Sequence, residues 1–369
     1  MNMDVLLAAL VEQKGSDLFI TVDAPPTLKV NGRLAPLGGS PLDKQAALAL
    51  VRESLDEAHF ERYLHTREAN YAIHREGLGR FRVSAFWQQD LPGMVLRRIE
   101  TRIPTFEELT LPSILQEVAM AKRGLVLFVG ATGAGKSTTQ AAMIGYRNQH
   151  GDGHILTVED PVEFVHQHGR CLVTQREVGI DTDSFDVALK NSMRQAPDVI
   201  LIGEIRTQET MELAIQFAET GHLCLATLHA NNANQALDRI LHLVPQEKHR
   251  QFLFDLSFNL RAIVAQQLLP SLHGQRRVAA FEILLNTPLI TDIVRKGEVH
   301  RLKEVMTKSG ELGMQTFDQA LFALFCAGQI GYSEALAHAD SANDLRLLIK
   351  LSGREQLGAG TLDNVTLDE

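Results

Sequence analysis

The sequence is poor in cysteine, with only Cys171, Cys224 and Cys326 among its 369 residues. These three residues lie far apart and are odd in number. They form neither a disulfide framework nor a set of zinc ligands. We therefore expect them to be reduced packing residues in a cytoplasmic protein.

Long hydrophobic runs are also missing, because no window approaches the ~18 continuous apolar residues of a transmembrane helix. Residues 1–13 are largely apolar, but they lack a basic leader and contain Asp4 and Glu12. They predict an amphipathic helix and not a signal peptide. We therefore expect no transmembrane segment.

An excess of positive charge is absent as well. The net charge is −9 and the isoelectric point is about 5.9. A protein that binds nucleic acid generally over its surface is usually basic. We therefore expect no stable nucleic-acid binding.

The remaining composition, 45% hydrophobic and 22% charged, is that of an ordinary globular protein, and its length predicts two or three domains. Alternating and helical patterns predict a mixed α+β domain over residues 1–100. Its expected elements are helices at 4–14 and 41–64, a turn at Asn31-Gly32, and strands at 16–22, 27–30, 70–73, 80–88 and 93–99. Residues 101–123 are expected to be a linker with a helical segment, 124–351 a second domain, and 352–369 a disordered tail.

In the second domain, apolar strand-like runs alternate with helical ones at 125–129, 155–159, 198–202 and 223–228. This alternation predicts an α/β domain with a largely parallel sheet. The first strand leads into a G-x-x-x-x-G-K-[ST] pattern and then a helix. That pattern binds phosphate through backbone N–H groups. The alternative is a glycine-rich turn without a ligand. The predicted nucleotide-binding residues are Gly130, Ala131, Thr132, Gly133, Ala134, Gly135, Lys136, Ser137 and Thr138.

Lys136 is expected to reach the β- and γ-phosphates, and the Ser137 hydroxyl to bind Mg²⁺. A second Mg²⁺ ligand is predicted at Glu204, which follows the strand at 198–202. We expect this strand to lie beside the P-loop strand, so that its carboxylate faces the metal. The alternative is an ordinary polar strand end.

A further strand ends in three carboxylates, Glu159, Asp160 and Glu163. One of them would align or deprotonate the water that attacks the γ-phosphate. Their spacing does not show which one does so, and a solvated turn is the alternative.

His222 and His229 flank the strand at 223–228, at its opposite ends. One of them would sense the phosphate while the other meets a neighbouring subunit; the alternative is two ordinary polar residues. Arg80, Arg82 and Arg97 lie on predicted strands of the first domain. Either they lie on a solvated outer face of the sheet, or they are presented to a phosphate.

Together, residues 130–138, 157–164, 201–206 and 220–231 resemble the Walker A, Asp box, Walker B and His box of the secretion and type IV pilus ATPases. The resemblance covers residues 17–351 and is strongest to the PilT family of pilus retraction ATPases. It implies a PAS-like N-terminal domain, a RecA-like ATPase domain with a helical C-terminal part, and ATP with Mg²⁺. It also implies a cytoplasmic homo-hexamer at the inner membrane, in contact with a pilus platform protein.

The same resemblance implies roles for individual residues. Glu163 would be the catalytic glutamate and Glu204 the Walker B glutamate. His222 and His229 would be the His-box pair. The arginines that the first domain brings towards the phosphates would be Arg80, Arg82 and Arg97.

Two departures from the family pattern are informative. Residues 289–296 stand where the retraction ATPases carry Ala-Ile-Arg-Asn-Leu-Ile-Arg-Glu, and Thr207 follows Arg206 where an aspartate is usual. Both departures resemble the PilU branch, an accessory paralogue that works beside a PilT-like retraction ATPase. The four-cysteine zinc insertion of the export ATPases is absent from the sequence.

We therefore expect an ATP-hydrolysing hexameric motor that assists pilus retraction, and with it pilus depolymerisation and twitching motility. One alternative is a nucleotide-binding scaffold or coupling subunit that acts through a PilT partner with little turnover of its own. Another is a DNA translocase, against which the acidic isoelectric point weighs.

Overall fold

The computed structural model describes residues 2–99, 102–272, 274 and 276–353. Residues 354–369 of the expected disordered tail lie outside this range. The chain divides into two compact units. The N-terminal unit comprises the described residues up to Ile103 together with Asp160–His166 and Glu177–Ser184, and the other described residues form the C-terminal unit.

The N-terminal unit is a six-stranded antiparallel sheet with three helices, in the strand order β3-β2-β1-β6-β5-β4. Alternating side chains of the strands, such as Phe81, Val83 and Ala85 on β5, pack with the apolar faces of the helices in one core. Its elements are α1 (Met3–Glu12), β1 (Asp17–Thr21), β2 (Thr27–Val30), β3 (Arg33–Pro36), α2 (Lys44–Ser54), α3 (Glu57–Thr66), β4 (Glu68–Arg75), β5 (Gly79–Gln88) and β6 (Leu91–Ile99).

The helix expected over residues 41–64 is two helices in the structure. Leu55 is extended and ends α2, and the Asp56 side chain then accepts a hydrogen bond from the backbone N–H of His59 as the N-cap of α3. A capping aspartate starts a new helix more favourably than it continues an old one. The apolar spacing carried no sign of this break.

The C-terminal unit contains a seven-stranded sheet in the order β13-β12-β7-β11-β10-β8-β9. The pairs from β12 through β7, β11 and β10 to β8 are parallel, and β13 is antiparallel to β12. The strands are β7 (Gly124–Val129), β8 (Gly153–Glu159), β9 (Cys171–Glu177), β10 (Val199–Ile202), β11 (Leu223–Leu228), β12 (Leu260–Pro270) and β13 (Arg277–Leu285). This sheet and the antiparallel sheet of the other unit confirm the expected α/β fold class.

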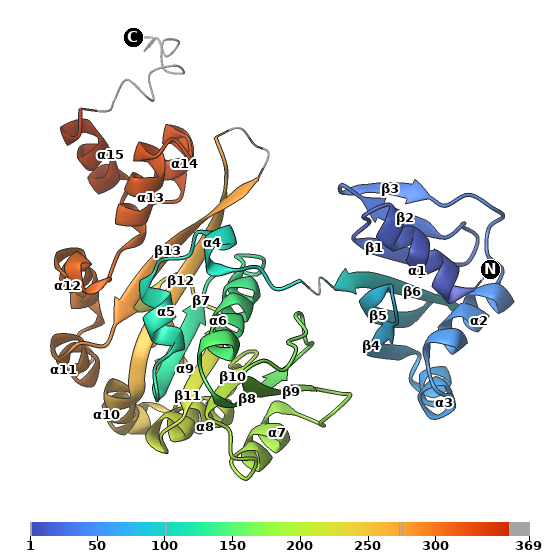
Figure 1. Ribbon diagram of the computed structural model, residues 1–369, viewed down its shortest axis with the longest axis horizontal. Helices are drawn as coiled ribbons and strands as arrows, with labels where there is room; N and C mark the ends of the chain where they lie inside the picture. The colour runs from blue at the N-terminus through green and yellow to red at the C-terminus, as the bar shows by residue number, and fades with distance from the viewer. Residues whose placement is uncertain (1, 100–101, 273, 275, 354–369) are drawn as a thin grey trace. The chain divides into compact units, whose positions relative to one another are not determined.

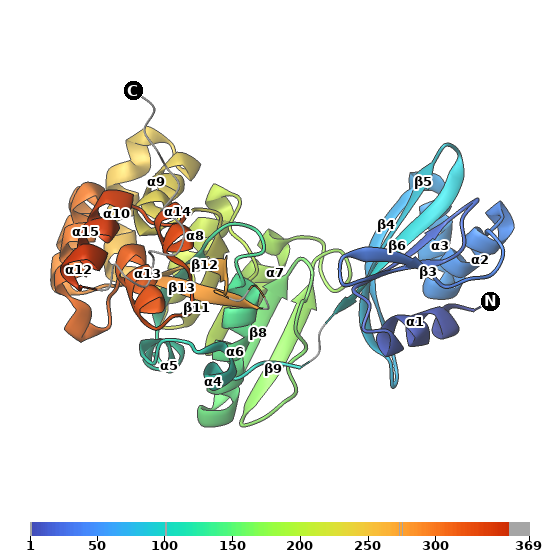
Figure 2. The same ribbon diagram turned by 90° about the horizontal axis from the view of Figure 1, so that it is seen from above.

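Helices cover both faces of this sheet (Figures 1 and 2). α5 and α6 pack on one face, where Leu115 and Met143 share a core with Val126 and Phe128 of β7. α8 and α9 lie on the other face. The helices are α4 (Phe106–Leu109), α5 (Ile114–Ala119), α6 (Lys136–His150), α7 (Phe185–Ser192), α8 (Gln208–Glu219), α9 (Ala233–Leu243), α10 (His249–Asn259), α11 (Pro288–Lys296), α12 (Leu302–Lys308), α13 (Phe317–Cys326), α14 (Tyr332–Ala337) and α15 (Ala342–Leu351), with short 3₁₀ turns at Gln246–Lys248, Val299–Arg301 and Gly310–Leu312.

Part of the range expected as a linker, residues 101–123, belongs to the core of the C-terminal unit. Thr105 caps α4 with a capping box, and Phe106, Leu115 and Val118 are buried in the core that contains β7. Burying large apolar side chains stabilises these short helices in place. The end of α4 and the residues that follow it, 108–111, form part of the wall of the cavity described below.

Candidate functional site

The P-loop joins β7 to α6, in the order that the sequence predicts. Gly130, Gly133 and Gly135 have φ angles of 148°, 79° and 87°, values that side chains rarely tolerate. Gly135 is the left-handed N-cap from which α6 begins at Lys136. The loop therefore stands at a helix N-terminus, where free N–H groups and the helix dipole favour an anion.

The Lys136 ammonium lies inside this loop. Its side chain is buried, and its Nζ donates hydrogen bonds to the carbonyls of Gly130 at 2.8 Å and Ala131 at 2.9 Å. A cation held by two carbonyl dipoles can exchange them for phosphate oxygens, which accept stronger charge-assisted bonds.

Strand β12 packs against the P-loop and contributes Gln266, a residue that was not predicted from the sequence. Its Oε1 accepts a hydrogen bond from Thr139 Oγ1 at 2.8 Å. A Cβ atom at Gly130 would lie 2.5 Å from the Gln266 carbonyl oxygen, and one at Gly135 would lie 2.8 Å from Gln266 Nε2. The missing side chains of Gly130 and Gly135 therefore leave room for β12 as well as for a ligand. A polar pair, Gln266-Gln267, inside an otherwise apolar run was the available signal.

Glu204 follows β10 at the edge of the sheet where the P-loop stands. Its side chain is 12% exposed, with Oε1 at 2.6 Å from an Arg206 nitrogen and Oε2 at 3.4 Å from His229 Nε2. The expectation that its strand lies beside the P-loop strand is wrong, because β11 lies between β7 and β10. β11 is wholly buried and pairs in parallel with both neighbours, which places His229 between the P-loop and Glu204 in strand order.

The two histidines that flank β11 are separated by the strand itself. Six strand residues span about 20 Å. His229 is at the P-loop end. His222, at the opposite end, contacts Thr220 Oγ1 at 3.0 Å and the Phe217 carbonyl at 3.1 Å through Nδ1. The structure therefore brings only His229 to the phosphate-binding edge.

The three carboxylates after β8 differ in their surroundings. Glu159 ends the strand, and its Oε1 accepts hydrogen bonds from Thr157 Oγ1 at 2.7 Å and Gln175 Nε2 at 3.4 Å. Asp160 and Glu163 are exposed, and both lie in the segment that belongs to the N-terminal unit. Only Glu159 is fixed within the C-terminal unit.

The three predicted arginines share one face of the N-terminal sheet, opposite the face that buries Phe81 and Val83. Arg80 binds the buried Glu177 carboxylate at 2.8 Å, and Arg97 binds the buried Asp17 carboxylate at 2.8 Å. Arg82 is exposed and stands opposite Arg97 across the strand pair. In this structure two of the three arginines thus hold buried carboxylates.

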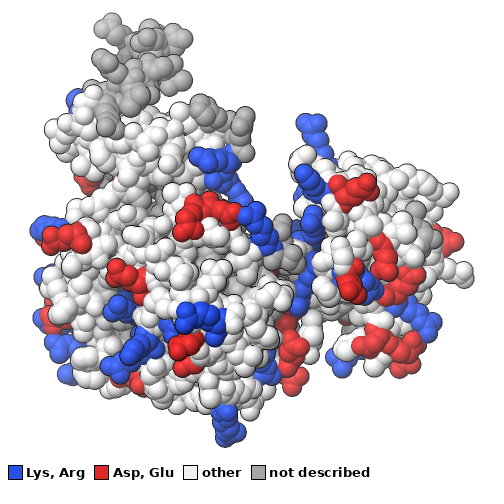
Figure 3. All heavy atoms as spheres, viewed as in Figure 1, with Lys and Arg blue, Asp and Glu red and all other residues white. Residues whose placement is uncertain are grey.

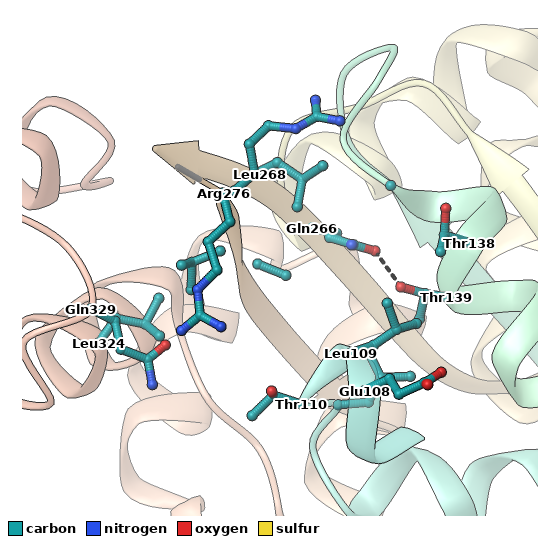
Figure 4. Close-up of a pocket in the computed structure, with 15 residues that line it drawn as sticks. Glu108, Leu109, Thr110, Thr138, Thr139, Gln266, Leu268, Arg276, Leu324 and Gln329 are labelled. Carbon is teal, nitrogen blue, oxygen red and sulfur yellow. Dashed lines mark hydrogen bonds between the residues drawn. The ribbon is translucent and has the colours of Figure 1, made fainter. Parts of the chain in front are cut away.

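A cavity of about 460 Å³ opens beside Gly135 and Thr138 (Figure 4). Polar and apolar groups contribute to its walls about equally. The lining residues come from α4, β12, β13 and α13 and from residues just outside the last two, and they include Glu108, Leu109, Leu268, Arg276, Val278, Leu324 and Gln329. A second cavity of about 350 Å³ lies along Gly130–Ala134 and includes Asn231, Gln267, Arg277 and His338.

The residues at the P-loop also fit a magnesium ion. Ser137 lies in the first turn of α6, and the largely buried Glu204 carboxylate stands at the same edge of the sheet. Among the described residues, no three His, Cys, Asp or Glu side chains gather into a metal-binding cluster. Mg²⁺ needs no such cluster, since it takes most of its ligands from water and substrate phosphates.

A phosphate-binding loop after an inner strand of a largely parallel sheet, with a carboxylate two strands away, defines a RecA-like P-loop nucleotide triphosphatase. The family model for Type II/IV secretion system proteins matches residues 76–313, and the chain belongs to this family. The family consists of secretion ATPases, and this chain is one of them.

Two relatives from Pseudomonas aeruginosa show where the chain lies within the family. It is 62% identical to the type IV pilus ATPase PilU over 95% of this chain and 92% of PilU. It is 39% identical to the retraction ATPase PilT over 91% of this chain and 97% of PilT. These identities confirm the resemblance to the PilT family and to its PilU branch.

The fold agrees with a solved relative. The crystal structure of the pilus retraction motor PilT with bound ADP matches with a TM-score of 0.89 at 35% identity, covering 94% of this chain and 99% of that one. In the part of the chain that is described, no helix is long and apolar enough to cross a membrane.

Proposed function

We propose that the protein is an ATP-hydrolysing subunit of a homo-hexameric motor that assists type IV pilus retraction, in the manner of an accessory ATPase. The observation that carries this proposal is the complete P-loop with its buried Lys136, in a chain 62% identical to a pilus ATPase over nearly its whole length. A PilT-like retraction ATPase and an inner-membrane pilus platform protein would be its partners, at the cytoplasmic side of that membrane.

The triphosphate of ATP would occupy the P-loop. Lys136 would release the carbonyls of Gly130 and Ala131 and bind the β- and γ-phosphates. Ser137 and Glu204 would hold Mg²⁺, which neutralises charge on the phosphates. The adenosine would enter the 460 Å³ cavity at Thr138, where apolar side chains such as Leu109 and Leu268 would pack on the base and polar side chains such as Gln329 would bond to its edge.

Hydrolysis also needs a group that aligns the attacking water. We assign this role to Glu163, as the resemblance to the retraction ATPases implies. Glu163 is exposed, whereas Glu159 is engaged by Thr157 and Gln175. His229 would report the γ-phosphate to Glu204, with which it pairs. His222, at the other end of β11, would face a neighbouring subunit.

The three arginines differ in how readily they would bind a phosphate. Arg82 is exposed and would meet a phosphate directly. Arg80 and Arg97 would first have to leave Glu177 and Asp17, which are buried carboxylates and hold them strongly. Arg82 is therefore the arginine most available for phosphate.

The test compares ATP turnover by Lys136→Ala and Glu163→Gln with that of the wild type. Lys122→Ala, an exposed lysine before β7, is the matched control for the first, and Asp160→Asn is the matched control for the second. ATP turnover by each test variant is expected to fall by at least about 100-fold, and each control is expected to keep the wild-type rate. Full turnover by Lys136→Ala would refute the proposal.

A scaffold role with little turnover is the second candidate, and α11 favours it. In place of the family pattern, Asp292 of this helix binds Arg295 at 2.6 Å and Lys296 at 2.7 Å. These two basic side chains are therefore tied within their own helix. A pilus-retraction assay beside an intact PilT partner separates the two roles. Retraction that persists with Lys136→Ala favours the scaffold, and its loss favours the motor.

A DNA translocase would need a cationic track. On the visible face of the C-terminal unit, Lys and Arg side chains are interspersed with Asp and Glu (Figure 3). Salt-sensitive binding to double-stranded DNA would support this role, and its absence would dismiss it.

A further inference from the structure

The C-terminal helices contact the nucleotide site through the short connection between α14 and α15, residues 338–341. His338 is the first of these residues. Its Nδ1 lies 3.2 Å from Gln267 Oε1, and its Nε2 lies 3.1 Å from Glu334 Oε1. His338 also lines the 350 Å³ cavity that runs along Gly130–Ala134 of the P-loop. A residue more than 200 positions away in sequence thus faces the P-loop.

Asp340 contacts the other side of the site, at the loop that follows β11. Its Oδ1 accepts a hydrogen bond from Asn232 Nδ2 at 3.3 Å. Asn232 is the N-cap of α9 and accepts from the Gln235 backbone N–H at 3.0 Å. The loop that it ends begins with His229, the partner of Glu204. Asp340 therefore holds the far end of a loop whose near end touches the Walker B carboxylate.

An ionic cluster built on one buried carboxylate also holds Asp340 in place. Glu282 on β13 is fully buried and accepts a hydrogen bond from the Ala233 backbone N–H at 2.8 Å. The Lys303 ammonium of α12 contacts the carboxylates of both Glu282 and Asp340. Burial raises the pKa of Glu282, an effect that Lys303 opposes. Because a buried ionic group that loses its partner is costly, the cluster resists rearrangement.

Residues 338–341 are also fixed to α13. The Asp318 carboxylate, on α13, accepts hydrogen bonds from the backbone N–H groups of Asp340 at 2.8 Å and Ser341 at 3.1 Å. Residues 338–341 are thus held by α13 and reach both β12 and the start of α9. A shift of the β11–α9 loop would be passed to α13 and α15 through these bonds.

We propose that His338 and Asp340 are positioning residues of the nucleotide site, which hold β12 and the β11–α9 loop in their catalytic arrangement and couple the γ-phosphate to the C-terminal helices. This inference rests on the proposed ATPase function. It differs from a purely structural role, because it requires the two side chains to affect the chemical step more than they affect folding or nucleotide binding.

The first test measures kcat, KM for ATP and the Kd for ADP of Asp340→Ala, Asp340→Asn and Asp344→Ala. We expect Asp340→Ala to lower kcat roughly 10-fold, since a misplacement of about 1 Å can cost up to about 100-fold. Its Kd for ADP should change less than about twofold, because the P-loop contacts remain. Asp340→Asn keeps an Oδ1 acceptor for Asn232 and should restore kcat. Asp344, an exposed acid of α15, is the matched control and should have no effect.

The second test measures hydrogen exchange in α13 and α15 of the full-length protein, with ADP and with a non-hydrolysable ATP analogue. In the wild type the analogue should protect these helices more than ADP does. This difference should vanish in His338→Ala, which removes a half-buried side chain, and persist in His300→Ala, which removes an exposed one. A wild-type kcat in Asp340→Ala, or an unchanged exchange difference in His338→Ala, would overturn the inference alone. Failure of the wild type to hydrolyse ATP would instead overturn the proposed function.

Discussion

The three glycines of the P-loop should differ in how badly they tolerate a methyl group. At Gly133, with φ of 79°, an added Cβ meets nothing within 4 Å. At Gly135, with φ of 87°, the same atom would lie 2.8 Å from the mobile amide end of Gln266. At Gly130, with φ of 148°, it would lie 2.5 Å from the Gln266 backbone oxygen. The structure therefore ranks three substitutions that look alike in sequence.

Their costs follow from these surroundings. Gly133→Ala should lose about 1–2 kcal/mol of unfolding free energy, which is the strain of a left-handed alanine. Gly135→Ala should cost about 1 kcal/mol more than this strain alone, since the Gln266 amide must move away from its hydrogen bond with Thr139. Gly130→Ala forces a strand backbone to shift, which adds about 1–3 kcal/mol of overpacking to about 1–3 kcal/mol of strain.

Scanning calorimetry of the purified variants tests this order. In a unit of this size, each 1 kcal/mol shifts the midpoint by about 2–4 °C. The chain offers an internal control, because its one tryptophan, Trp87, lies in the N-terminal unit. The transition seen by Trp87 fluorescence should stay in place while the calorimetric transition of the C-terminal unit moves. If Gly133→Ala destabilises the protein as much as Gly130→Ala, the reasoning from β12 is refuted.

Three further predictions concern buried groups. Burial lowers the pKa of His166 to about 4, so that the folded state binds fewer protons than the unfolded state between pH 4 and about 6.5. Stability should fall as the pH drops through this window, by roughly 3 kcal/mol in all; urea titrations at several pH values should show a flatter profile for His166→Asn, and identical profiles would contradict this. Arg80→Ala should destabilise the N-terminal unit by about 3–5 kcal/mol because Glu177 stays buried without its partner, and an unchanged Trp87 unfolding midpoint in urea would exclude that. Burial also raises the pKa of the Cys224 thiol, so native-state alkylation by iodoacetamide should reach Cys326 first; equal rates for both would argue against the core assignment.

Much of the fold and of the site could be predicted from local patterns. The strand that precedes Gly130, the loop and the start of a helix followed from three signals that lie next to each other in the chain. The break at Leu55 and the strand between β7 and β10 were not predicted. A single capping side chain decides the first, and the order of strands in a sheet, which no local pattern encodes, decides the second.

The sites show the same division. Arg80 and Arg97 were predicted from their strand positions, but their buried partners Glu177 and Asp17 were not. Glu177 is 97 residues from Arg80, so no spacing rule connects them. Gln266 and His338 were not predicted, because glutamine and histidine occur at many positions without a functional role. Only their position beside the P-loop in the structure marks them as site residues.

By itself, the sequence determined the phosphate-binding chemistry, because a P-loop places its backbone N–H groups and its lysine by short-range geometry. It also determined the family, since several motifs occur in the right order along one chain. Only the tertiary structure decided which groups surround that loop. β12, the β11–α9 loop and the α14–α15 connection meet there because parallel strands bring their ends to one edge of a sheet, and helices far along the chain pack against that edge.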